Sequence, residues 1–143
     1  MSPLQSLADY ELFIYTVQGR HSSIKRSTLT VIRRGARVAR VTGELEFESG
    51  FRLNVREKLS FEGGGGQIEG YAYEIWRGSE LLCWYDSQPH PQDPALAETQ
   101  PHHKHVPPDI KHHRIPASDL SFAHPNLPGL IREIEILLTR SLS

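Results

Sequence analysis

This sequence of 143 residues has a single cysteine, no long apolar run and no strong net charge. The single cysteine, Cys83, excludes an internal disulfide and fits a reducing cytoplasm. No apolar run approaches the ~20 residues that cross a bilayer. The N-terminus also lacks the basic and apolar regions of a signal peptide. We therefore expect a cytoplasmic protein that does not enter a membrane.

The formal net charge is only −1, which argues against a strongly basic nucleic-acid binder. The charge is nevertheless unevenly spread. Residues 1–60 hold ten Lys/Arg and six Asp/Glu, whereas residues 61–143 hold six and eleven. The first part of the chain could therefore present a basic face.

The length and the hydrophobic pattern predict a single α+β domain over residues 1–143. Alternating apolar and polar residues predict an antiparallel meander of about five strands over about 26–86. A Pro/His-rich loop follows over about 87–125, and a C-terminal helix over about 127–141. An N-terminal helix and the C-terminal helix are expected to pack on the sheet.

Both predicted helices have recognisable starts. Ser6-Leu7-Ala8-Asp9 resembles a capping box, and Tyr10 and Ile14 continue a helical spacing. Asn126 is a good N-cap for the last helix, and Pro128 falls in its first turn, where proline is tolerated. The last helix carries one apolar stripe, formed by Leu127, Leu130, Ile131, Ile134, Leu137 and Leu138.

Glu-Leu-Glu-Phe-Glu over residues 44–48 is typical of a half-buried strand, and Ser49-Gly50 is a hairpin signal. Opposed glutamates and arginines across this hairpin account for most of the basic charge, and we favour this interpretation over a nucleic-acid patch. The four glycines 63–66 lack the residues of a phosphate-binding loop and indicate a flexible hairpin loop. Cys83, beside Trp84 on a strand, is interpreted as a buried small hydrophobe.

The chemistry is concentrated between Trp84 and Pro116, which contain six of the eight histidines and seven of the ten prolines. Histidine suits proton transfer and metal ligation near neutral pH. Proline excludes this segment from a helix interior or a central strand. We therefore expect a functional loop carried by the sheet.

Flanking prolines favour an extended backbone around His102-His103-Lys104-His105. Residues two apart then point the same way, so His103 and His105 share one face while His102 and Lys104 share the other. Histidines can move the two protons of ribonucleotide cleavage, and a lysine or arginine can stabilise the transition state. The catalytic candidates are Asp86, His90, His103, Lys104, His105 and Arg114.

Two other interpretations stay open. Asp86, His90, His103 and His105 could instead hold zinc or another divalent ion, although their spacing matches no standard zinc signature. The histidines could also be structural, pairing within an ordered loop. A metal-independent reaction needs no cofactor.

The same residues resemble the TumE-like family, which is named after a bacterial toxin. The resemblance is carried by Tyr85-Asp86-Ser87-Gln88-Pro89-His90-Pro91, by residues 102–111 and by Asn126-Leu127-Pro128. It implies the toxin of a toxin–antitoxin pair, neutralised by a small cognate antitoxin. It transfers no catalytic residues, so the roles above come from chemistry alone.

The leading hypothesis is a type II toxin that acts as a metal-independent ribonuclease through its His-rich loop. The alternatives are a metal-dependent hydrolase or nuclease with histidine ligands, and a non-enzymatic protein-binding module. Expected partners are an antitoxin protein and RNA, with no membrane, and a homodimer is left open.

Overall fold

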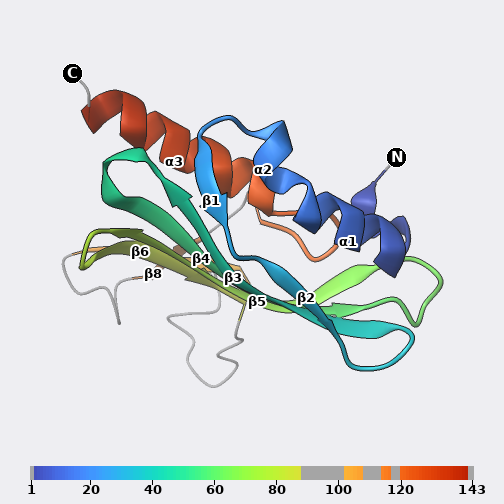
Figure 1. The fold of residues 1–143 in the computed structure, drawn as a ribbon. Helices are drawn as coiled ribbons and strands as arrows, with labels where there is room; N and C mark the ends of the chain where they lie inside the picture. The colour runs from blue at the N-terminus through green and yellow to red at the C-terminus, as the bar shows by residue number, and fades with distance from the viewer. Residues whose placement is uncertain (1, 88–101, 108–113, 117–119, 142–143) are drawn as a thin grey trace.

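The computed structural model describes residues 2–87, 102–107, 114–116 and 120–141. Within those residues the chain forms one antiparallel sheet of eight strands, with the helices on one of its faces (Figure 1). The strands are β1 (Ile24–Ser27), β2 (Thr30–Arg33), β3 (Val38–Phe47), β4 (Phe51–Ser60), β5 (Gln67–Arg77), β6 (Glu80–Asp86), β7 (His103–His105) and β8 (Arg114–Pro116). The helices are the short η1 (Pro3–Gln5) and η2 (Glu48–Gly50), then α1 (Leu7–Tyr15), α2 (Val17–Arg20) and α3 (Leu127–Ser141). The predicted α+β class is confirmed.

Strands β3 to β8 follow one another across the sheet, so each pairs with its neighbour in the sequence. Both β1 and β2 pair with β3, at its two ends. Gly43 makes this arrangement possible: its φ is +135°, and a Cβ there would lie 2.5 Å from the carbonyl oxygen of Thr28. The chain between β1 and β2 therefore packs against β3 at the one position of that strand that has no side chain.

The prediction of about five strands is too low. The segment that was predicted as a loop over 87–125 contributes two further short strands, β7 and β8, and β1 adds another at the opposite edge. Pro116 is compatible with a strand here because β8 is the last strand in the order of the described sheet. Proline is tolerated in an edge strand, because its missing N–H can face away from the neighbouring strand.

Alternation along the strands separates the sheet into an inner face under the helices and an outer face. On β4 the inner positions Phe51, Leu53, Val55 and Leu59 are buried, whereas Arg56 and Lys58 on the outer face are exposed. The inner face of the sheet packs against the apolar sides of α1 and α3 to form one core. Of the predicted stripe on α3, Leu127, Leu130, Ile131 and Ile134 are buried in it.

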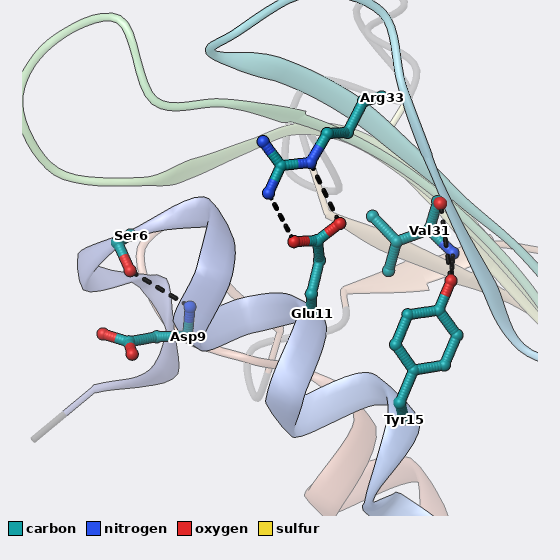
Figure 2. Close-up of polar contacts among 6 residues, drawn as sticks. All are labelled: Ser6, Asp9, Glu11, Tyr15, Val31 and Arg33. Atoms are coloured by element: carbon teal, nitrogen blue, oxygen red, sulfur yellow. Dashed lines mark hydrogen bonds and ion pairs between the residues drawn. The ribbon is translucent and has the colours of Figure 1, made fainter.

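Helix α1 is fastened to the edge strand β2 by polar contacts (Figure 2). The predicted cap is present, because the Ser6 hydroxyl accepts a hydrogen bond of 3.0 Å from the Asp9 N–H. Glu11 receives two hydrogen bonds from the Arg33 guanidinium, of 2.6 and 3.1 Å. The Tyr15 hydroxyl accepts a 2.9 Å hydrogen bond from the Val31 N–H and donates a longer one, 3.5 Å, to the Val31 carbonyl. The tyrosine therefore occupies both polar backbone groups of one residue in the edge strand.

Asn126 directly precedes α3, as predicted, but its side chain also serves the loop before the helix. Its Oδ1 accepts from the Ser121 N–H at 2.9 Å, and its Nδ2 donates to the Ser121 carbonyl and to the Tyr73 hydroxyl. The residue thereby ties the start of α3 to β5.

Candidate functional site

The His-Lys-His run forms strand β7, which extends the sheet beyond β6. In the register, Asp86 pairs with His103, Tyr85 with Lys104, and Trp84 with His105. Strand β8 then places Arg114 opposite His105. The candidate residues are thus attached to the end of a long strand rather than to an independent loop.

Lys104 and His105 point to opposite faces of the sheet, as their alternation predicts. The Lys104 ammonium lies on the inner face, 3.3 Å from Glu133 Oε2 of α3 and 5.1 Å from the centre of the Tyr85 ring. The His105 ring contacts Trp84 edge-on, with 4.5 Å between ring centroids, and its Nε2 is 3.3 Å from Asp86 Oδ2. The predicted cation and the predicted acid–base group are therefore separated by the sheet.

Burial distinguishes the two members of the Asp86–His105 pair. The His105 side chain is 1% exposed, whereas that of Asp86 is 21% exposed. Solvent and ligands therefore reach the pair through the carboxylate. The histidine therefore lies behind an accessible aspartate.

On the inner face, Glu133 gathers several donors. It accepts hydrogen bonds from the Tyr85 hydroxyl and, at 3.7 Å, from the Cys83 thiol, in addition to the contact with Lys104. Burial, with a further contribution from the charge of Glu133, raises the pKa of Cys83 to about 12. The thiol is therefore neutral near pH 7 and a poor nucleophile, which agrees with the interpretation of Cys83 as a buried hydrophobe.

On the inner face, His102 packs between Tyr71 and Phe122. Its ring is stacked on Tyr71, with an interplanar angle of 3°, and its Nδ1 shares a 2.6 Å hydrogen bond with the Tyr71 hydroxyl. Burial lowers the pKa of His102 and raises that of Tyr71. Both side chains are consequently neutral near pH 7, and their role here is packing.

Three of the predicted site residues are described only in part or not at all. His90 lies outside the described residues. For His103 and Arg114 the structure describes the backbone in β7 and β8 and the register, but not the side chain.

The outer face of the sheet carries a groove of about 450 Å³ that was not predicted. Asp86 and Ser87 line one side of it, and the other side is lined by basic residues of β3 and β4, namely Arg40, Arg56 and Lys58. Between the two sides lie Gly70 and Ala72 on β5. In the register, Arg56, Ala72 and Asp86 form one row across the sheet.

The basic side of the groove is unusual in its charge pairing. Arg40 lies directly opposite Lys58 in the register, an arrangement of like charges that destabilises a sheet. Lys58 has an exposed ion pair of 3.5 Å with Glu69, but neither Arg40 nor Arg56 has an ion-pair partner within the described part of the chain. The predicted pairing of arginine with glutamate holds for Arg52, which lies 3.0 Å from Glu44, and not for these two.

Behind the groove, on the inner face of β4, lies a buried carboxyl group. Glu57 accepts hydrogen bonds of 2.6 Å from the Tyr10 hydroxyl and 2.5 Å from the Tyr73 hydroxyl, and Asn126 donates to Tyr73. Burial raises the pKa of Glu57 more strongly than the two tyrosine hydrogen bonds lower it. This network connects α1, the sheet and the start of α3, and it supports the strand that carries Arg56 and Lys58.

Cationic side chains and the Asp86–His105 pair lie on opposite sides of this part of the outer face. Guanidinium and ammonium groups bind phosphate oxygens, and the Asp86–His105 pair lies at the other side of the same groove. A metal site is less developed: across residues 2–87, 102–107, 114–116 and 120–141, no three His, Cys, Asp or Glu side chains lie together in a way that could hold an ion.

Comparison with known proteins gives one clear result. The family model described as toxin TumE matches residues 13–138, which is most of the chain. No curated protein and no solved structure shows a significant match. Among the described residues, no helix is long and apolar enough to span a membrane. The chain belongs to the family of toxin TumE, and it is therefore a toxin of a toxin–antitoxin system.

Proposed function

We propose that this toxin is a metal-independent ribonuclease that binds RNA on the outer face of its sheet, and that a protein antitoxin neutralises it in the manner of a type II system. One observation carries the proposal: Arg40, Arg56 and Lys58 line one side of a groove whose other side is lined by Asp86. The two arginines have no ion-pair partner within the described part of the chain. A toxin in the cytoplasm that presents such a groove meets RNA as its most abundant polyanion.

The proposed chemistry needs two proton transfers and one cationic site. Asp86 accepts the proton of a ribose 2′-OH as its oxygen attacks the adjacent phosphorus. The bond from phosphorus to the 5′-oxygen breaks, and that oxygen receives a proton from an acid. The products are a 2′,3′-cyclic phosphate and a 5′-hydroxyl. Each proton-transfer role is worth about 10²–10⁴-fold in rate.

His103 is the proposed acid, because it is the register partner of Asp86. His105 supports Asp86 from behind, through the contact of 3.3 Å between Nε2 and Oδ2. Arg40, Arg56 and Lys58 bind the phosphate and stabilise its developing charge. His90 and Arg114 stay predictions for further contacts with the substrate.

In this proposal, Lys104 has a positioning role and does not bind phosphate. Its ammonium is held by Glu133 on the inner face, across the sheet from the groove. We assign it to positioning: the contact fastens β7, and with it His103 and His105, to helix α3.

The test is cleavage of RNA by the purified protein in excess EDTA, with analysis of the product ends. We expect 2′,3′-cyclic phosphate and 5′-hydroxyl ends, and a loss of about tenfold or more in rate for Arg56→Ala. Arg52→Ala is the matched control, because Arg52 lies on the same strand and face but is paired with Glu44. RNA that stays intact across many substrates, including translating ribosomes, would contradict the proposal.

Two outcomes would favour the alternative functions. Activity that EDTA abolishes and zinc restores would favour a metal-dependent nuclease that uses Asp86 and His105 as ligands. For a non-enzymatic module, growth arrest is the informative measurement. Two variants are tested: one carries both His103→Ala and His105→Ala, and the other carries Asp86→Asn. If both variants arrest growth as the wild type does, the toxin acts without these groups.

A further inference from the structure

Two neighbouring outer-face positions of β5 carry almost no side chain. Gly70 is the register partner of Lys58, and Ala72 is the register partner of both Arg56 and Asp86. Because adjacent strands are about 4.8 Å apart, Arg56 on β4 and Asp86 on β6 face each other across roughly 10 Å, and in the described part of the chain Ala72 is the residue between them. The groove is thus a trough one strand wide, with cations along the β4 side.

The glycine in this floor is not required by its φ angle or by crowding from the described residues. Gly70 has no left-handed φ, and among the described residues a Cβ at this position would meet the Ser87 hydroxyl oxygen, at 3.6 Å, which is an ordinary contact. Gly43 is the opposite case, because a Cβ there would collide with backbone atoms at 2.5 Å. A glycine inside a strand often marks a bulge, and the register does shift between the pairs Lys58–Gly70 and Leu59–Ile68. Gly70 suits this irregularity and, because it has no side chain, it also leaves the floor of the groove low.

We propose that the trough is a nucleoside subsite for single-stranded RNA. One nucleotide lies with its ring on Gly70 and Ala72, and its phosphates contact Arg56 and Lys58. These two cations are two residues apart on one strand, roughly 7 Å, a spacing that lets them contact successive phosphates of an extended strand. The proposal rests on the ribonuclease function and specifies its substrate class.

The geometry excludes a double helix from the floor. In a duplex the bases are paired and stacked between two backbones, so neither a base nor a ribose ring can enter a trough one strand wide. A duplex would contact only the cations at the rim. A positively charged groove that follows the backbone is a common feature of proteins that bind single strands.

Binding can be separated from cleavage with a 2′-O-methyl oligoribonucleotide of about ten residues, which lacks the attacking hydroxyl. Its affinity for the purified toxin is compared with that of the same sequence annealed into a duplex, over a range of salt concentrations. Gly70→Leu fills the floor, and Lys58→Ala removes a cation. Gly129→Leu is the matched control, because Gly129 lies on α3, over the opposite face, and no atom of the described residues lies within 4 Å of an added Cβ.

We expect the wild type to prefer the single strand. Gly70→Leu should lower its affinity for the single strand by about tenfold while leaving duplex binding nearly unchanged. Lys58→Ala should instead reduce the salt dependence of single-strand binding by about 0.7 in logarithmic slope, as expected for one lost phosphate contact. Gly129→Leu should match the wild type in both measurements.

Different results overturn different proposals. Equal binding of single strand and duplex by the wild type, or wild-type binding by a folded Gly70→Leu variant, would overturn the nucleoside subsite. If Gly70→Leu lost only antitoxin binding, the trough would belong to the protein partner and the subsite would likewise be overturned. Single-strand binding as expected, with no cleavage of ordinary RNA, would leave the subsite in place and contradict the ribonuclease.

Discussion

The two faces of the sheet differ in how their charged side chains are paired, although the same strands form both faces. On the inner face, the carboxyl group of Glu57 receives two tyrosine hydroxyls, and Lys104 is paired with Glu133. On the outer face, Arg40 is placed opposite Lys58 and has no ion-pair partner within the described residues. The inner arrangement satisfies buried groups, as folding requires. The outer one tolerates repulsion, which stability alone does not explain.

Strand β4 shows this difference between the two faces within three consecutive residues. Glu57 points inward into its hydrogen-bond network, while Arg56 and Lys58 point outward into the groove. If the comparison is correct, a change at the inner residue should affect stability, and changes at its neighbours should affect RNA cleavage. The substitutions below separate these two effects.

The largest effect is expected for Glu57→Leu. The change leaves the hydroxyls of Tyr10 and Tyr73 buried without their acceptor, which should cost about 2–4 kcal/mol in the free energy of unfolding. Urea denaturation measures this. A loss below about 0.5 kcal/mol would mean that the network contributes little and that the inner face does not depend on satisfied polar groups.

Arg40→Glu should change activity and stability in opposite directions. It removes a phosphate-binding cation, so we expect the rate of RNA cleavage to fall about tenfold. It also replaces a like-charged pair by an opposite pair with Lys58, which should raise the free energy of unfolding by a few tenths of a kcal/mol. A variant that loses both activity and stability would show that Arg40 has a structural role, and the contrast between the faces would fail.

The sequence was informative where local patterns decide the structure. The Ser6 cap, the turn at Ser49-Gly50, the start of α3 at Leu127 and the alternation of β3 to β6 were all predictable, because each depends on neighbouring residues. The family resemblance, carried by the His-rich block, was confirmed as well.

The groove could not be predicted, because it is defined across strands. Its rows join Arg56 to Asp86 through Ala72, residues that are 14 to 16 positions apart, and only the register of three strands brings them together. The sequence pattern predicted that arginines face glutamates across the hairpin. In the observed register, neither Arg40 nor Arg56 is opposite a glutamate of the neighbouring strand. The presence of Gly70 and Ala72 at alternate outer positions of one strand was the one local signal that was overlooked.

The strands β7 and β8 were missed for a related reason. Histidine and proline have little intrinsic strand preference, so the segment was interpreted as a loop. The exposed edge of β6 and its register with His103–His105 override that local preference.

Glu57→Gln makes the stability comparison sharper through its pH dependence. The pKa of Glu57 is raised above its ordinary value of 4.5, so the folded protein binds this proton more tightly than the unfolded chain does. The resulting stabilisation is fully present below about pH 4.5 and is lost as pH rises through the raised pKa. Glutamine does not titrate, so the difference in free energy of unfolding between wild type and variant should shift in favour of the variant as pH rises from about 4.5 to 8. Parallel curves would contradict the raised pKa.

The smallest expected effect concerns the edge of the sheet at β2 (Figure 2). Tyr15→Phe removes the hydroxyl that serves the Val31 N–H and carbonyl, at a cost of about 0.5–1 kcal/mol in the free energy of unfolding. It also leaves two backbone groups of an edge strand open to pairing with another chain. We therefore expect the variant to associate with itself at high concentration in sedimentation experiments, more than the wild type does. Tyr15→Leu, which lacks the hydroxyl and the ring, should behave in the same way if the exposed backbone is the cause. If only Tyr15→Phe associates, its phenyl ring, and not the edge strand, is responsible.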